Sequence, residues 1–266
     1  MDRSAELLAA YDAQLRTDAE TPSAVAVARL GPLRLVTFAG GRGFVTYKDL
    51  GGADASTIRG WVREAVAHYR RDPSITRVEW KTRGHDHAPG LHDALLDSGF
   101  TPDEAESIMI GEARALAVGV PLPAGVRLRR VTAESDVRAM CVMVSSVFDD
   151  PHADEVADAL LRRLALGDGM ELWIAEAEDE IISAGRLEPV RDSQFAGIWG
   201  GATTPRWRGQ GIYRALTAAR ARSALGAGKT LIHSDSTAYS RPILERAGLI
   251  AVSTTTPYRW RRARHG

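Results

Sequence analysis

Residues 203–216 decide how this chain is interpreted, and they read TTPRWRGQGIYRAL. The apolar residues before Thr203 predict a strand, and Pro205 marks the exit from it. After Gly211 the spacing of the apolar residues predicts an amphipathic helix. Gly209 and Gly211 lie between strand and helix, where glycine lets the backbone approach a ligand closely. The sequence therefore predicts a strand, a glycine-containing loop and a helix in succession.

This loop has the chemistry of an anion-binding site. The first N–H groups of a helix have no partner within the helix, and the helix dipole adds a partial positive charge there. Arg206, Arg208 and Arg214 add further positive charge around the loop. Together these features suit a pyrophosphate group, with an ordinary glycine turn before a helix as the alternative.

Two common phosphate-binding motifs do not fit the loop. A P-loop requires Gly-Lys-Ser/Thr, which does not follow Gly211. A dinucleotide-binding motif requires a third glycine where Arg214 stands, and no strand ending in Asp or Glu lies at the expected distance.

The loop resembles motif A of the GNAT (GCN5-related N-acetyltransferase) family. The family signature, Arg/Gln-x-x-Gly-x-Gly/Ala, falls on Arg208, Gly211 and Tyr213, and Tyr213 replaces the small residue. Residues 240–249, SRPILERAGL, are similar to the family's motif B helix, which ends in Gly-Phe. The resemblance covers roughly residues 123–262 and extends more weakly to the first half.

The resemblance implies that the chain binds acetyl-CoA as an acyl donor and uses no metal ion. The backbone at Ala202 and Thr203 would pair with the pantetheine arm. Ser240 stands where many relatives have an Asn that contacts the CoA arm. The loop amides would hold the pyrophosphate, and they belong to Arg208, Gly209, Gln210, Gly211, Ile212 and Tyr213.

The chain also divides into two halves of mixed α/β pattern. Residues 117–125, AVGVPLPAG, contain two prolines, two glycines and no charge, which is typical of a linker. Residues 91–100 and 241–249 resemble each other, because each predicts a short helix that ends at a glycine followed by a large apolar residue. We therefore expect two tandem GNAT-like domains, each a mostly antiparallel sheet flanked by helices. Their predicted bounds are 1–118 and 126–266, with a linker at 119–125.

The first half lacks the arginine-containing loop. Between the strand expected near Tyr47 and the helix expected from Ser56, the only glycine pair is Gly51-Gly52, with no arginine beside it. We therefore expect a degenerate first domain, a scaffold that could form one wall of the acceptor site.

The family's reaction is a direct attack of an amine on the thioester carbonyl, so a base must remove a proton from the ammonium form. Relatives often carry a Glu on the fourth strand, which residues 197–202 lack. Glu188 and Asp235 each end a neighbouring strand and are the candidate bases, with an exposed loop position as the alternative for both. Many relatives protonate the leaving thiolate with a motif B Tyr, where this chain has Leu244.

Composition limits the partners. The chain of 266 residues has 34 Lys plus Arg against 34 Asp plus Glu, which argues against a protein that coats nucleic acid or an anionic membrane. One Cys excludes an internal disulfide and a multi-thiolate metal site, and the histidines at 85, 87 and 92 have no recognised ligand spacing. No apolar run approaches the roughly 18 residues of a membrane span, and residues 1–16 predict an amphipathic helix. We expect a cytoplasmic protein without a nucleic-acid or membrane partner.

The expected activity is acyl-CoA-dependent N-acyl transfer, from acetyl-CoA to a small-molecule primary amine. A small acceptor is expected because no strongly basic or acidic stretch marks a macromolecular partner. The alternative from another class is a non-catalytic acyl-CoA sensor, which the absence of a Tyr at position 244 favours. Transfer to oxygen or sulfur differs only in the acceptor and stays open.

Overall fold

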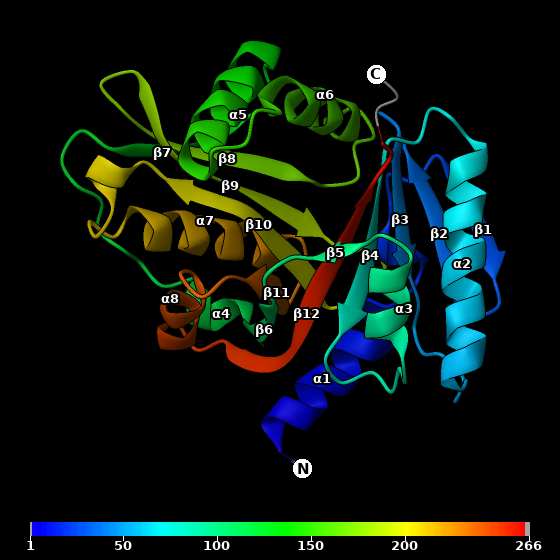
Figure 1. Ribbon diagram of the computed structural model, residues 1–266. Helices are drawn as coiled ribbons and strands as arrows, with labels where there is room; N and C mark the ends of the chain where they lie inside the picture. The colour runs from blue at the N-terminus through cyan, green and yellow to red at the C-terminus, as the bar shows by residue number, and fades with distance from the viewer. Residues whose placement is uncertain (1, 264–266) are drawn as a thin grey trace. The chain divides into compact units, whose positions relative to one another are not determined.

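The computed structural model describes residues 2–263 and divides the chain into two compact units (Figure 1). One unit holds the described residues up to Ile108 together with those from Val252 onward, and the other holds Met109–Ala251. The division therefore differs from the predicted linker at 119–125 and the predicted second domain at 126–266. Packing explains the difference, because Tyr258 and Trp260 are buried in the first core, whereas residues 109–125 belong to the second unit.

The first unit is a sheet covered by helices. Its strands follow the order β1, β2, β3, β4, β12, and the short β5 pairs with β12. All of these pairs are antiparallel except β3 with β4, which are parallel because a helix connects them. The strands are β1 (Ala26–Leu30), β2 (Leu33–Phe38), β3 (Arg42–Thr46), β4 (Arg77–Arg83), β5 (Thr101–Pro102) and β12 (Ile250–Arg261). The helices are α1 (Arg3–Gln14), the 3-10 turn η1 (Asp18–Glu20), α2 (Ala55–Arg71) and α3 (Leu91–Asp97).

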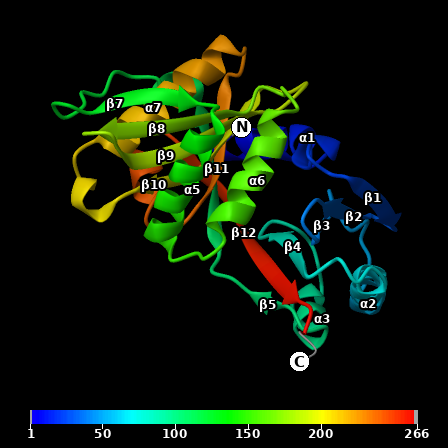
Figure 2. The same ribbon diagram turned by 90° about the horizontal axis from the view of Figure 1, so that it is seen from above.

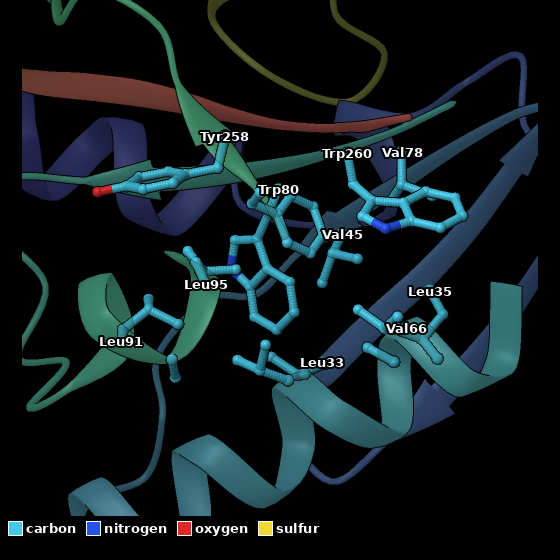
Figure 3. Packing of buried hydrophobic residues seen from close by; sticks show 14 of the residues in the cluster. Leu33, Leu35, Val45, Val66, Val78, Trp80, Leu91, Leu95, Tyr258 and Trp260 are labelled. Atoms are coloured by element: carbon cyan, nitrogen blue, oxygen red, sulfur yellow. The ribbon is translucent and has the colours of Figure 1, made fainter. Parts of the chain in front are cut away.

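The core of the first unit forms around Trp80 (Figure 3). Trp80 is fully buried on β4, and its ring meets that of Phe100 edge-on with centroids 6.2 Å apart. Along α2, Ile58, Val62, Ala65 and Tyr69 are buried at helical spacing and pack into this core. Full burial of one such large side chain contributes about 1.5–3 kcal/mol to the free energy of unfolding.

The second unit has a sheet with helices on both faces. Its strands follow the order β6, β11, β10, β9, β8, β7. The pairs from β7 to β10 are antiparallel, and β10 with β11 is parallel. The strands are β6 (Glu106–Glu112), β7 (Arg127–Val131), β8 (Glu171–Ala177), β9 (Glu180–Pro189), β10 (Phe195–Thr203) and β11 (Leu231–Ser236). This sheet has the mixed α/β character that the sequence predicts.

Helices α5 and α6 cover one face of this sheet, and α7 covers the other (Figures 1 and 2). On the α7 face, Ala196 and Ile198 of β10 pack against Ala221 and Ala224. On the α5 face, Ile174 and Ala184 pack in one cluster with residues of α5 and α6. The helices are α4 (Ala113–Leu116), α5 (Glu134–Phe148), α6 (Ala153–Leu164), the 3-10 turn η2 (Pro205–Trp207), α7 (Ile212–Gly226) and α8 (Arg241–Arg246).

The repeat that the sequence suggests is present in both units. Gly99 follows α3 and Gly248 follows α8, with φ angles of 87° and 96°. A left-handed glycine at this place satisfies the last carbonyl groups of the helix. None of the helices within residues 2–263 is long and apolar enough to cross a membrane.

Candidate functional site

Strands β10 and β11 part at their C-terminal ends. They pair only at Phe195 with Leu231, Ala196 with Ile232 and Gly197 with His233. Beyond these pairs β10 continues to Thr203 and β11 to Ser236. The predicted residues Ala202, Thr203 and Asp235 therefore lie on the two strands where these have separated.

A bulge interrupts β10 where the strands part. Trp199 pairs with Arg186 and Ala202 pairs with Ala184, so Gly200 and Gly201 together face only Gly185 of β9. Gly200 adopts a φ of 60°, a conformation that favours glycine. A bulge leaves backbone groups outside the regular ladder, and here those groups lie beside the diverging strands.

The backbone at Ala202 and Thr203 is partly engaged within the protein. The Ser183 hydroxyl donates to the Ala202 carbonyl at 2.6 Å, and Arg208 Nε donates to the Thr203 carbonyl at 3.0 Å. A ligand that pairs with this part of β10 must therefore share these carbonyl oxygens or use the N–H groups of the strand.

The loop before α7 has the predicted open geometry. Gly209 and Gly211 adopt φ angles of 75° and 80°, and Gly211 is the N-cap of α7. The Ala215 N–H donates to the Gly211 carbonyl at 2.9 Å, which is the first backbone bond of the helix. Among the described residues, no backbone carbonyl accepts from the N–H groups at positions 209–214. These donors are oriented as a helix start presents them, and they can bind anionic oxygens.

The loop is exposed on its Gly209 side. Arg208, Gly209 and Gln210 are all exposed, and a Cβ at Gly209 would have no atom within 4 Å. Arg208 and Arg214 add positive charge there, but Arg206 forms an ion pair with Glu180 at 2.5 Å. The charge of Arg206 is therefore largely offset, a contact that the local sequence did not indicate.

Tyr213, the large residue at a position where relatives have a small one, packs beneath the sheet. A Cβ on Gly201 would lie 2.6 Å from the Tyr213 ring, so the glycine makes room for it. The Arg220 guanidinium lies under Gly185 and donates to the Arg186 carbonyl at 3.2 Å. Burial lowers the pKa of Arg220, and Tyr213 acts in the opposite direction. The Tyr213 side chain thus packs against the sheet, and its backbone N–H stays at the helix start.

Asp235 lies on the part of β11 that has left β10. It shares a face of the strand with His233, because residues two apart point the same way. The His233 ring meets Phe195 and Trp199 edge-on, with centroids 5.8 and 5.1 Å apart. Asp235 is partly buried and lies on the face of the sheet that carries these aromatic rings.

Glu188, the other predicted base, is held in ion pairs. Its Oε1 lies 2.5 Å from Arg186 Nε and its Oε2 lies 3.4 Å from Arg163 Nη1. It pairs with Gly197, at the end of β10 that is still joined to β11. Each carboxylate oxygen contacts a guanidinium group, which favours a structural role over proton transfer.

The residues of the motif B region differ in their exposure. Ser240 is the N-cap of α8, and its hydroxyl lies 3.4 Å from both the carbonyl and the hydroxyl of Thr237. Tyr239 is 91% exposed, and Leu244 is buried. Tyr239 therefore does not place its phenol where the motif B Tyr of relatives would be.

A cavity of about 130 Å³ lies beside the loop, between α4, α7 and α8. Its lining residues are Ala115, Leu116, Val118, Val120, Tyr213, Arg214, Thr217, Ile243, Leu244, Arg246 and Ala247. Most of them are apolar, with Arg214 and Arg246 as charged members. Sequence reasoning missed this cavity because folding alone brings residues 115–120 to the start of α7.

Two further features concern reactive side chains. Cys141 is buried, and burial raises the pKa of its thiol to about 11, which keeps it protonated at neutral pH. Over residues 2–263 no three His, Cys, Asp or Glu side chains are grouped so that they could hold a metal ion.

The corresponding place in the first unit is filled by a buried charged network. β4 runs on to Arg83 past the end of its pairing with β3, and Arg83 forms an ion pair with Glu20. Arg16 donates to both carboxylate oxygens of Asp86 at 2.7 and 2.9 Å, and to the Tyr47 carbonyl at 3.1 Å. In the first unit, charged side chains thus fill the region that corresponds to the diverging ends of β10 and β11 in the second unit.

Residues 138–248 match the model of the acetyltransferase (GNAT) family. No curated protein matches the chain.

Several solved structures share the fold. A GCN5-related N-acetyltransferase from Kribbella flavida has a TM-score of 0.65 at 16% identity, over 100% of this chain and 98% of its own. A tandem GNAT protein from the clavulanic acid biosynthesis pathway has a TM-score of 0.61 at 16% identity, over 99% and 97%. A functionally unknown conserved protein from Staphylococcus epidermidis has a TM-score of 0.66 at 11% identity, over 90% and 95%. These similarities show the fold.

Proposed function

Residues 138–248 are a domain of the GNAT acetyltransferase family, and from this premise we propose that the protein transfers an acetyl group from acetyl-CoA to a small primary amine. The observation that carries the proposal is the loop at 208–213, which is exposed at Arg208, Gly209 and Gln210. Its amides are presented by a helix start, immediately after a bulged strand that parts from its neighbour.

The diphosphate of acetyl-CoA would bind at this loop. The N–H groups of Gly209 to Arg214 would donate to its oxygens, and the dipole of α7 would favour its negative charge. Arg208 and Arg214 are exposed at the same place and would add attraction. From there the pantetheine arm would follow β10 past Thr203 and Ala202 toward the bulge.

The chemistry would take place where β10 and β11 part. N–H groups near Gly200 and Gly201 would polarise the thioester carbonyl, since donors fixed before the reaction stabilise the developing negative charge. Asp235 would hold the ammonium group of the acceptor and accept its proton, directly or through water. The amine nitrogen would then attack the carbonyl carbon and the carbon–sulfur bond would break.

The leaving thiolate would receive little help from motif B. Leu244 has no proton to donate, and Tyr239 is directed to solvent. A thiol pKa of about 8.5 nevertheless makes a thiolate an acceptable leaving group near neutral pH. Solvent would supply the proton afterwards.

Acetyl-CoA affinity tests the binding half of the proposal. In Gly209→Leu the new side chain would enter open space over the loop, and we expect at least a tenfold loss of affinity in calorimetry. Gly228→Leu is the matched control, because Gly228 has a φ of 74° and equally open surroundings beyond the other end of α7. Both variants should lose similar stability, about 1 kcal/mol. Equal acetyl-CoA affinity in the two variants would refute the assignment of the loop.

A non-catalytic acyl-CoA sensor is the second candidate, favoured by Leu244 and by the ion pairs of Glu188. Release of free thiol from acetyl-CoA, followed with a panel of primary amines, separates the two. Release that depends on an amine supports the transferase, whereas binding without any turnover supports the sensor.

A further inference from the structure

Part of the segment that was expected to be a linker lies against the candidate diphosphate loop. We define it as the connecting segment, residues 117–122, with the sequence AVGVPL. A Cβ on Gly211 would lie 3.6 Å from Val120 Cγ1 and 3.8 Å from the Pro121 carbonyl oxygen. The other loop glycine, Gly209, has nothing within that range. The loop is thus open on one side and walled on the other.

The connecting segment is fastened to α7 and its surroundings at both ends. At one end Arg222 Nη1 donates to the Ala117 carbonyl at 3.3 Å. At the other end Leu122 packs in an apolar cluster with Ile212 and Trp207. The middle of the segment is held between two attachments, both within the second unit.

Between these attachments the segment borders the cavity beside the loop. Val118 and Val120 line it together with Tyr213 and Arg214, which belong to the first turn of α7. No charged residue occurs in the connecting segment. An anion bound at the start of α7 therefore meets amides and arginines on one side and an uncharged apolar wall on the other.

From this geometry we propose that the connecting segment is part of the ligand site, with Val120 next to the bound diphosphate. The inference rests on the proposed function, since it places a wall beside the same diphosphate. It assigns a binding role to residues outside the strand, loop and helix that carry the family motif. Ligand binding would then also hold in place the chain that leads to β7.

Opposite charges at one position test this proximity. In Val120→Asp the new carboxylate would repel the diphosphate, and we expect acetyl-CoA affinity to fall about tenfold. In Val120→Lys the ammonium would attract it, so the affinity should stay equal or rise. Because salt screens such interactions, the difference between the two variants should shrink in 1 M salt, where the Debye length is about 3 Å. Calorimetry with acetyl-CoA measures all of these affinities.

Val142→Asp is the matched control, because Val142 is exposed and lies on α5, across the sheet from α7 (Figure 1). It should bind acetyl-CoA as the unchanged protein does. Amide hydrogen exchange in residues 118–122 should slow when acetyl-CoA is added.

Three outcomes would overturn the inference. Affinities of both Val120 variants within twofold of the unchanged protein would show that the wall is distant from the bound diphosphate. An equal loss in both variants would indicate a packing defect without electrostatic contact. Failure of the unchanged protein to bind acetyl-CoA would refute the proposed function itself, and the inference with it. In the first two cases acetyl-CoA binding and the effect of Gly209→Leu would still stand.

Discussion

Helix α2 of the first unit and α7 of the second both follow a strand and begin just after glycines, but their N-cap residues differ. The N-cap of α2 is Asp54, whose carboxylate accepts the Thr57 N–H at 2.8 Å. The N-cap of α7 is Gly211, which has no side chain. An N-cap side chain satisfies a first N–H group of α2, whereas in α7 we propose that a ligand does so.

The strand ends beside these helices also differ between the two units. In the first unit Arg16, Arg83, Glu20 and Asp86 fill the region with mutual ion pairs. In the second unit the ends of β10 and β11 carry a glycine bulge and one partly buried carboxylate, Asp235. In the first unit ion pairs occupy this region, whereas in the second unit the proposed ligand would bind there.

The largest expected effect concerns the filled site. In Arg83→Met the largely buried Glu20 would lose its ion-pair partner, and we expect the free energy of unfolding to fall by about 3 kcal/mol. Thermal denaturation measures this loss. If acetyl-CoA affinity fell as well in the folded variant, the ion pair of the first unit would serve ligand binding and not stability alone.

The same ion pair predicts a pH dependence of stability. Burial raises the pKa of the Glu20 carboxyl, but Arg83 and further partners lower it more, so that the net pKa lies below its ordinary value. Such a carboxyl stabilises the fold above its unfolded pKa of about 4.3, and this contribution is lost as the pH falls through the lower folded pKa. Denaturation curves between pH 3 and 7 should show a weaker acid dependence for Glu20→Gln than for the unchanged protein.

The next effect concerns the open site. In Asp235→Asn the proton acceptor is removed with little change in volume, and we expect kcat to fall about 100-fold while acetyl-CoA affinity is kept. Glu188→Gln is the control. The loss of its ion pairs should lower the melting temperature, and its kcat should fall less than that of Asp235→Asn. Thiol release and calorimetry measure the two quantities. A larger loss of kcat in Glu188→Gln than in Asp235→Asn would identify Glu188 as the proton acceptor in place of Asp235.

A smaller effect is expected from placing a carboxylate at the N-cap of α7. In Gly211→Asp the carboxylate would lie beside the helix start and repel the diphosphate. We expect acetyl-CoA affinity to fall about tenfold. In the first unit, Asp54→Ala should lower the melting temperature and leave acetyl-CoA affinity unchanged. Unaltered acetyl-CoA affinity in Gly211→Asp would mean that the residue at the N-cap does not affect binding at the start of α7.

The smallest effect is expected at Tyr239, next to Ser240. Its phenol is directed to solvent, so Tyr239→Phe should change kcat by less than twofold at every pH between 6 and 9. A selective loss of rate would identify Tyr239 as the proton donor that Leu244 cannot be.

Local sequence patterns predicted the loop and its helix because glycine positions and apolar spacing are local properties. Gly209, Gly211 and the helix that follows lie where the pattern places them. The arrangement around them depends on contacts between distant residues. The pairing of Thr255 with Arg83, the ion pair of Arg163 with Glu188 and the approach of Val120 to Gly211 all join residues far apart in the chain. No periodicity or short motif encodes these contacts, so the sequence could not reveal them.

The placement of β12 has a consequence for synthesis. Its residues Tyr258 and Trp260 complete the core of the first unit, and Pro257 to Arg261 pair with Lys81 to Arg77 of β4. Translation delivers these residues long after the rest of that unit has left the ribosome. The earliest part of the chain must therefore wait, with one edge of its sheet uncovered, until nearly all of this sequence has been made.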